Sequence, residues 1–286
     1  MFLNDEDFEK LQKNTRAYLA EILESSCLFQ NASWKYLEKG QGDAVLCLHG
    51  IGYSKVLWKP FIGLLAEHHR VIAPDIPGLC LRTDFPAKEL TIRYLLEWLK
   101  DFLKTLDVPQ IHIIGHGLGG TLATYFTAEY PEKVLTYTWL NPTDQIKSRT
   151  NDLKDWENVK TGFDSVEQAT QHRNRLFYSA PNLPDVVQRS YINAINKAIT
   201  DGRVLRLLAN ESPRVPLIIA KQMQIQQHSL LVSSSHDVYG DASQTEQLSK
   251  KMPNAQWVNI EDCGHFCLIE KTAEVVEVYK RFLGSC

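Results

Sequence analysis

Short apolar segments alternate along the chain with longer segments in which apolar residues recur every three or four positions. The short segments predict strands at 34–37, 44–48, 71–74, 110–114, 135–140, 230–236 and 257–260. The longer segments predict helices at 57–67, 90–106, 118–126 and 272–283. This alternation is typical of a mostly parallel central sheet with helices on both faces, so the sequence predicts an α/β fold.

Two regions depart from the alternation. Residues 8–28 have the spacing of an amphipathic helix, with the apolar stripe Phe8, Leu11, Tyr18, Leu19, Ile22 and Leu23. We therefore expect residues 1–30 to carry an N-terminal helix packed on or near the core. Residues 31–142 and 228–286 then form that core.

Residues 143–227 show no convincing strand and several polar helical stretches, at 165–175, 184–200 and 201–209. This composition predicts a helical lid inserted into the core. Its aromatic side chains are expected to supply an apolar wall: Trp156, Phe163, Phe177 and Tyr178. Lids of this kind commonly exclude water from a site.

Charge and hydropathy exclude several functions. The 286 residues carry a net charge of −3, and the lysines and arginines are scattered, so nothing favours nucleic-acid binding. No apolar run approaches the ~20 residues that a membrane span requires. The first residues are acidic where a signal peptide is basic, which predicts a cytoplasmic protein. The oligomeric state stays open.

The cysteines are scattered through apolar segments, which predicts reduced packing residues: Cys27, Cys47, Cys80, Cys263, Cys267 and Cys286. The run Cys263-Gly264-His265-Phe266-Cys267 superficially looks like a metal-ligand cluster. No second cluster completes a four-ligand site, so we predict no metal and no cofactor.

The most informative motif is Gly115-His116-Gly117-Leu118-Gly119, which joins the predicted strand 110–114 to the predicted helix 118–126. The pattern is that of the nucleophile elbow Gly-x-Ser-x-Gly, with Gly117 at the serine position. Glycine accepts the strained backbone of that turn readily. Replacement of serine by glycine therefore leaves the fold possible and removes the attacking atom.

Other motifs follow in a fixed order. His49-Gly50-Ile51 ends an apolar strand before the elbow, Asp237 follows the strand after it, and Gly264-His265 follows the last strand. In this order the chain resembles the α/β-hydrolase superfamily of lidded serine hydrolases over about residues 32–284.

The resemblance implies a site. Gly117 would stand at the nucleophile position, His265 would be the general base, and Asp237 would orient it. The amides of Ile51 and Leu118 would form the oxyanion hole. The pocket would be lined by His49, Gly50, His116, Trp156 and Phe177.

Rival residues are weighed against these assignments. Asp241 and Asp144 also follow predicted strands and compete with Asp237 for the role of the acid. His116 beside the elbow is interpreted as a packing residue, and His236 as a bystander. Cys267 is a poor substitute nucleophile because no cysteine occupies an elbow.

Several functions stay open at this stage. The scaffold predicts hydrolysis of a small ester or related carbonyl compound, with carbon–carbon bond hydrolysis of a ketone as a close second. With Gly117 in place, the chain is an inactivated variant of a serine hydrolase or a non-catalytic relative that binds a small molecule or a protein. In the remaining alternative, the His265–Asp237 dyad performs chemistry without serine.

Overall fold

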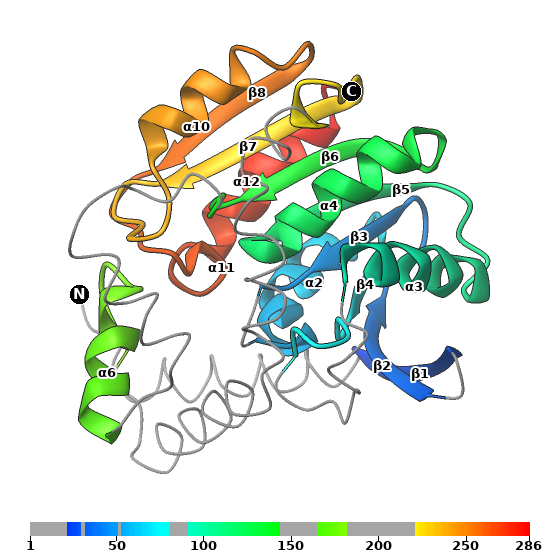
Figure 1. Ribbon diagram of the computed structural model, residues 1–286, viewed down its shortest axis with the longest axis horizontal. Helices are drawn as coiled ribbons and strands as arrows, with labels where there is room; N and C mark the ends of the chain where they lie inside the picture. Colours follow the sequence, from blue (N-terminus) through cyan, green and yellow to red (C-terminus); the bar gives the residue numbers. More distant parts are fainter. Residues whose placement is uncertain (1–21, 30–31, 51–52, 81–90, 144–164, 182–220) are drawn as a thin grey trace.

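A computed structural model describes residues 22–29, 32–50, 53–80, 91–143, 165–181 and 221–286. Its centre is an eight-stranded sheet in the order β1-β2-β4-β3-β5-β6-β7-β8 (Figure 1). The strands are β1 Leu23–Phe29, β2 Ala32–Lys39, β3 Ala44–Leu48, β4 Arg70–Pro74, β5 Ile111–His116, β6 Val134–Leu140, β7 His228–Ser234 and β8 Ala255–Ile260. The pairs β1/β2 and β2/β4 are antiparallel, and all neighbours from β4 to β8 are parallel.

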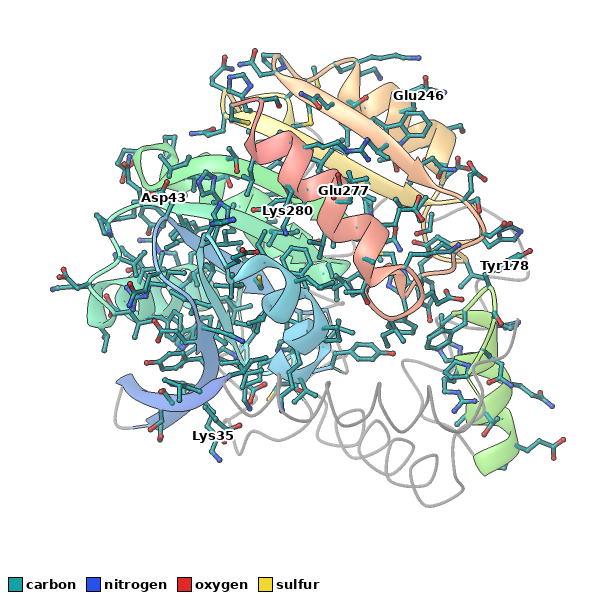
Figure 2. All side chains as sticks on the ribbon, turned by 180° about the vertical axis from the view of Figure 1, so that it is seen from behind. Lys35, Asp43, Tyr178, Glu246, Glu277 and Lys280 are labelled. Atoms are coloured by element: carbon teal, nitrogen blue, oxygen red, sulfur yellow. The ribbon has the colours of Figure 1, made fainter. Side chains whose placement is uncertain are left out.

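Helices cover both faces of this sheet. The helices of the described residues are η1 Lys55–Trp58, α2 Lys59–Leu65, α3 Ile92–Thr105, α4 Leu118–Glu129, η3 Pro131–Lys133, α6 Val166–Arg175, α10 Ala242–Ser249, α11 Cys267–Glu270 and α12 Thr272–Leu283, of which α6 lies away from the sheet (Figure 1). Figure 2 shows α2 and α12 over one face, and the other face is packed by α3, α4 and α10. The predicted α/β fold with a mostly parallel sheet is confirmed.

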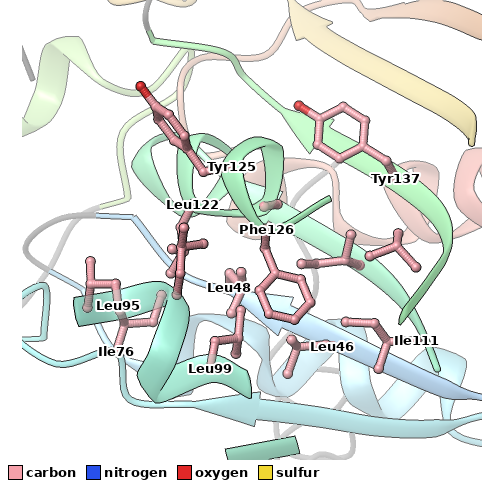
Figure 3. Close-up of a cluster of buried hydrophobic side chains, with 14 of the residues drawn as sticks. Leu46, Leu48, Ile76, Leu95, Leu99, Ile111, Leu122, Tyr125, Phe126 and Tyr137 are labelled. Atoms are coloured by element: carbon pink, nitrogen blue, oxygen red, sulfur yellow. The ribbon is translucent and has the colours of Figure 1, made fainter. Parts of the chain in front are cut away.

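The pleat of the strands divides the core into two layers. Leu46 and Leu48 of β3 enter the cluster formed with α3 and α4, whereas Val45 and Cys47 enter the cluster formed with α2 and α12. Figure 3 shows Leu46 and Leu48 packed beneath the apolar side chains of both α3 and α4. Because both faces are covered, β3 is buried along its whole length.

The predicted N-terminal helix is wrong over its last residues. Leu23–Phe29 is strand β1, which forms an antiparallel hairpin with β2 in the register Leu23↔Glu38 to Phe29↔Ala32. Glu24 and Lys35, on the two strands, form an ion pair of 3.1 Å. Cross-strand pairing therefore overrides the helical spacing here. The rest of the predicted helix, residues 1–21, lies outside the described residues.

One helix of the predicted lid is present. Helix α6 spans Val166–Arg175, and the Ser165 hydroxyl oxygen caps it by accepting from the amide of Gln168 at 3.1 Å. The predicted helical stretches at 184–200 and 201–209 lie outside the described residues. The lid as a whole stays a prediction.

Close backbone contact fixes the crossing of α4 over β3. A Cβ atom at Gly119 would lie 2.2 Å from the carbonyl oxygen of Leu48. We expect Gly119→Ala to lower the free energy of unfolding by about 1–3 kcal/mol, because the strand and the helix must separate to admit the methyl group. Urea denaturation measures this change.

Gly284→Ala is the matched control. Gly284 has a φ of −72°, and an added Cβ would meet its nearest neighbour, the Lys280 carbonyl oxygen, at an ordinary 3.5 Å. We expect this variant to be as stable as the unaltered chain, or more stable by a few tenths of a kcal/mol. Equal destabilisation by both substitutions would contradict the packing argument.

Candidate active site

The predicted site residues gather where the parallel strands end. His49 follows β3 and Gly117 follows β5, and Asn141, which the sequence did not predict as a site residue, follows β6. Asp237 and His265 lie in the loops after β7 and β8. Since carboxyl ends of parallel strands share one edge of the sheet, five loops meet there.

Gly117 forms the sharp turn between β5 and α4. Its φ is +52° and its ψ is −123°, a conformation that residues with side chains rarely adopt. Strand β6 holds the turn: the Gly117 amide donates to the Leu140 carbonyl at 3.0 Å, and Trp139 Nε1 donates to the Gly117 carbonyl at 2.8 Å. The turn is thus fixed by contacts that need no side chain at position 117.

The space beside Gly117 faces the imidazole of His265. A Cβ atom at Gly117 would lie 3.5 Å from His265 Nε2. A serine hydroxyl would extend from that Cβ into hydrogen-bond range of the ring nitrogen. The structure therefore brings the predicted nucleophile position and the predicted base together.

Asp237 holds the other side of the ring. His265 Nδ1 donates to both carboxylate oxygens of Asp237, at 2.9 and 3.0 Å, and both residues are buried. This bond fixes the tautomer in which Nε2 is unprotonated and able to accept a proton. Burial acts to raise the pKa of Asp237, but His265 and the Tyr239 amide, which donates at 2.8 Å, together lower the pKa below its ordinary value.

The rival residues have other partners. The Asp241 carboxylate caps α10 by accepting from the amides of Ser243 and Gln244. His236 is exposed, with Nδ1 at 2.8 Å from the Ser235 hydroxyl. Asp144 lies outside the described residues. Of the two described candidates, only Asp237 bonds to His265.

Of the two predicted oxyanion donors, the structure describes Leu118. A Cβ at Gly50 would lie 3.9 Å from the amide nitrogen of Leu118, so the loop after β3 touches the start of α4. Within the described residues, no backbone carbonyl accepts from the Leu118 amide, as expected for the first N–H of a helix. Ile51, the other predicted donor, lies outside the described residues.

These contacts bring Gly117, His265 and Asp237 together at the edge of an α/β sheet. A family model described as alpha/beta hydrolase fold matches residues 43–272. The chain belongs to the α/β-hydrolase fold family.

Relatives within the family have different substrates. Monoacylglycerol lipase ABHD6 of Bos taurus is 23% identical over 263 residues, covering 86% of this chain and 77% of that protein. The 2-hydroxy-6-oxo-6-phenylhexa-2,4-dienoate hydrolase of Burkholderia cepacia is 26% identical over 246 residues, covering 80% and 83%. An uncharacterized protein of Mycobacterium tuberculosis is 35% identical over 95 residues, and this match spans only 28% of its length.

A solved structure shares the hydrolase fold. The putative lipase lip1 from Acinetobacter baumannii AYE superposes with a TM-score of 0.82 at 22% identity, covering 100% of this chain and 97% of that one. No helix in the described ranges is both long and apolar enough to cross a membrane.

In this α/β-hydrolase, His49 holds a loop rather than facing a ligand. Its ring is fully buried, Nδ1 donates to the Gly50 carbonyl at 2.7 Å, and Nε2 accepts from the Ile76 amide at 2.9 Å. Both ring nitrogens are therefore engaged by backbone groups. Burial lowers the pKa of His49 from 6.5 to about 4, so the ring stays neutral at neutral pH.

This shift predicts acid sensitivity. Below pH 6.5 the unfolded chain takes up a proton on His49, whereas the folded chain does so only near pH 4. We expect His49 to contribute ~2 kcal/mol of the stability lost between pH 7 and pH 5. Denaturation at both pH values should show less pH dependence for His49→Gln. An unchanged pH dependence in a folded His49→Gln protein would contradict the assignment.

A buried ion pair supports the same loop. Lys55 Nζ donates to Asp75 Oδ2 at 2.6 Å, and the Lys55 amide donates to Asp75 Oδ1 at 2.9 Å. Lys55 and Asp75 are 2% and 5% exposed. Lys55 also lies 3.3 Å from Glu24 of β1. The pair ties the loop after β3 to the loop after β4.

Sequence reasoning missed the residues that hold the backbone of His265. Its carbonyl accepts from Asn141 Nδ2 at 2.7 Å and from His116 Nε2 at 2.8 Å. Asn141 also accepts from the Ser234 hydroxyl at 3.0 Å and has a φ of +49°. The only available signal was its place after a buried strand at the carboxyl edge of the sheet. His116, predicted near the pocket, is buried and acts through this bond.

Thr143 was also missed. Its side chain is 6% exposed, and its Cγ2 atom would lie 3.6 Å from a Cβ at Gly117. Among the described residues, nothing hydrogen-bonds to its buried hydroxyl. Thr143 therefore presents its methyl group to the nucleophile position, with an unpartnered buried hydroxyl on the same Cβ atom.

The chain after α6 is tied to the His265 loop, residues 261–266. The His265 amide donates to the Leu176 carbonyl at 2.7 Å. The Glu270 carboxylate accepts from the amides of Gly264, Tyr178 and Ser179, at 2.8, 3.2 and 2.8 Å. A Cβ at Gly264 would lie 2.5 Å from the Leu176 carbonyl oxygen, so only glycine fits there. Figure 2 shows Tyr178 at this junction.

Phe177, a predicted pocket residue, lies at this junction. Its ring lies 4.9 Å from that of Phe266, which in turn lies 5.5 Å from the His265 ring. Tyr239 adds a third aromatic ring, 5.1 Å from His265. Trp156 lies outside the described residues. The described aromatic wall therefore comes from three loops.

The cysteines near His265 are neutral thiols. Burial raises the pKa of Cys263 to about 11 and raises that of Cys267 as well. Neither thiol is a ready nucleophile or metal ligand at neutral pH. Within the part of the chain that the structure describes, no three His, Cys, Asp or Glu side chains form a metal-binding group.

Proposed function

We propose that this chain carries the site of a serine-type hydrolase for a small carbonyl compound, with Gly117 at the nucleophile position. His265 is the base, Asp237 orients it, and Leu118 supplies an oxyanion donor. The chain as it stands binds such a compound without forming an acyl-enzyme. The cytoplasmic location expected from the sequence stays a prediction.

One observation carries the proposal. The Cβ direction of Gly117 meets His265 Nε2 at 3.5 Å, while Nδ1 of the same ring donates to Asp237. A histidine with one nitrogen on a buried carboxylate and the other facing an elbow is arranged to take a proton from a group at that elbow. No other described contact requires Nε2 to face this space.

A small ester is the preferred substrate class, because ester hydrolysis is the commonest activity on this scaffold and a monoacylglycerol lipase is among the relatives. A ketone cleaved at a carbon–carbon bond is the second candidate, favoured by the dienoate hydrolase relative. Both compounds present a carbonyl whose oxygen becomes negative, and both use the same oxyanion donor.

Covalent labelling tests the proposal without knowledge of the natural substrate. Gly117→Ser protein is incubated with a fluorophosphonate probe, which reacts with an activated serine and releases fluoride. We expect a stoichiometric adduct at position 117, found by mass spectrometry of the peptide. The unaltered chain is expected to remain unlabelled there.

The double variant Gly117→Ser/His265→Ala is the control. It keeps the hydroxyl and loses the base, so we expect labelling to fall to the background level. Absence of an adduct in a folded Gly117→Ser protein would refute the proposal. An adduct that forms equally well without His265 would show that the ring does not act as the base.

A further inference from the structure

We propose that the unaltered chain hydrolyses esters by direct attack of water, with His265 as the base and Thr143 as a second residue that holds the water. This inference rests on the proposed function, because it uses the same base and the same oxyanion donor. It adds an activity to the chain with glycine at position 117 and assigns a role to Thr143.

The base is available for this chemistry. Nδ1 of His265 is committed to Asp237, and no described residue hydrogen-bonds to Nε2. The unprotonated Nε2 therefore points at the space beside Gly117 with a free lone pair. A water there would donate one hydrogen bond to Nε2, as the serine hydroxyl would.

Thr143 supplies the second partner. Its Cγ2 lies 3.6 Å from the Cβ position of residue 117, and Oγ1 is attached to the same Cβ atom as Cγ2. A rotation of χ1 to another staggered position brings Oγ1 to the place that Cγ2 occupies and moves Cγ2 to the place of the Cβ hydrogen. A hydroxyl that is buried without a partner costs about 1–3 kcal/mol, so a water bonded to it is stabilised.

The space beside Gly117 admits a further heavy atom. A Cβ there would meet its nearest neighbours at ordinary contact distances of 3.5–3.8 Å. A buried water needs two to four polar partners. His265 Nε2 and Thr143 Oγ1 supply two, and the water oxygen keeps a lone pair for the carbonyl carbon.

The reaction balances without a covalent intermediate. The water oxygen forms a bond to the ester carbonyl carbon as Nε2 takes one water proton, and the oxyanion forms near the Leu118 amide. The intermediate collapses, the bond from carbon to the alkoxy oxygen breaks, and His265 returns the proton to the leaving alkoxide. The products are a carboxylic acid and an alcohol, and Asp237 keeps its hydrogen bond to the ring throughout.

Steady-state hydrolysis of p-nitrophenyl acetate by the unaltered chain tests the inference. We expect turnover at least ~10-fold above that of His265→Ala, without a pre-steady-state burst, since general-base catalysis contributes about 10²–10⁴-fold. Incubation with the fluorophosphonate probe should leave this turnover unchanged. The same treatment should abolish turnover by Gly117→Ser.

Thr143 is tested by two variants of matched shape. Thr143→Val removes the hydroxyl and keeps the volume, and we expect kcat to fall by about 10-fold with KM unchanged. Thr143→Ser keeps the hydroxyl and should stay within about threefold of the unaltered chain. Gly117→Ala puts a methyl group where the water binds, so its turnover should fall to that of His265→Ala. Thermal melting confirms that each variant is folded.

The outcomes separate the two proposals. Labelling of Gly117→Ser, together with no His265-dependent turnover by the unaltered chain, overturns water attack and leaves the proposed function standing. Equal kcat values for Thr143→Val and Thr143→Ser overturn the role of Thr143. A fluorophosphonate or acyl adduct on Thr143 itself overturns the water route in favour of a threonine nucleophile. Failure to label a folded Gly117→Ser protein removes the basis of both proposals.

Discussion

Gly117→Ser is expected to raise kcat/KM for p-nitrophenyl butyrate on the order of 10⁴-fold over the unaltered chain. In a serine protease, loss of the serine costs about 10⁶-fold in turnover; the expected gain is smaller because we propose that the unaltered chain already hydrolyses esters by attack of water. The backbone of the elbow is already held by Leu140 and Trp139. A serine at a φ of +52° should lower stability by roughly 1–3 kcal/mol without moving the turn.

Asp237, the proposed acid, supplies the control for the gain in kcat/KM that is expected of Gly117→Ser. In the Gly117→Ser background, Asp237→Asn keeps the shape of the side chain but no longer holds His265 in the tautomer with a free Nε2. We expect kcat to fall by about 10³–10⁴-fold, near the loss known for the same change in a serine protease. Ser235→Ala, in the same loop, removes a hydroxyl that lies 2.8 Å from Nδ1 of the exposed His236, and it should leave kcat unchanged. Retention of full activity by Asp237→Asn would contradict the assigned acid.

Removal of the Asp75 carboxylate is expected to give the largest loss of stability. Asp75→Asn leaves Lys55 buried, with Glu24, itself about half exposed, as its remaining carboxylate within the described residues. An uncompensated buried charge costs about 3–5 kcal/mol. We therefore expect the free energy of unfolding, measured by urea denaturation, to fall by that amount. In the Gly117→Ser background kcat should fall as well, because the segment after β3, which carries the proposed oxyanion donor Ile51, loses its ion pair with the loop after β4.

Two comparisons make this stability prediction specific. Lys55→Met/Asp75→Leu replaces both charges with apolar groups and should be more stable than Asp75→Asn alone. Glu246→Gln breaks the exposed pair with Lys250 on α10, where Glu246 lies at the surface in Figure 2, and should cost less than about 0.5 kcal/mol. If Asp75→Asn costs no more than Glu246→Gln, the buried pair does not support the loop.

Local sequence patterns were sufficient to predict elements whose own apolar residues decide their structure. The predicted strand 44–48 and the predicted helix 272–283 agree with β3 and α12 at both ends. The first is a continuous apolar run and the second has apolar residues at helical spacing, so burial of each follows directly from its sequence. The order of elbow, acid and histidine likewise predicted the residues that the fold brings together.

Local patterns could not predict the features that depend on contacts with residues distant in sequence. Leu23–Phe29 is a strand because β2 pairs with it, and its own spacing favoured a helix. Asn141 and Thr143 belong to no motif, and their importance follows from the fold, which carries the end of β6 past Gly117 and His265. Contacts between residues of five different loops leave no local pattern in a single sequence.

The bonds from Glu270 and His265 to residues 176–179 define a boundary for protein engineering. If the predicted lid were exchanged with the matching segment of a relative, a foreign peptide would lie against Gly264, whose missing Cβ would be only 2.5 Å from a carbonyl oxygen. The graft would then displace His265, the proposed base. Residues 176–179 and Glu270 belong with the His265 loop in this sense, and a chimera should keep them so that the proposed substrate pocket changes without the proposed base.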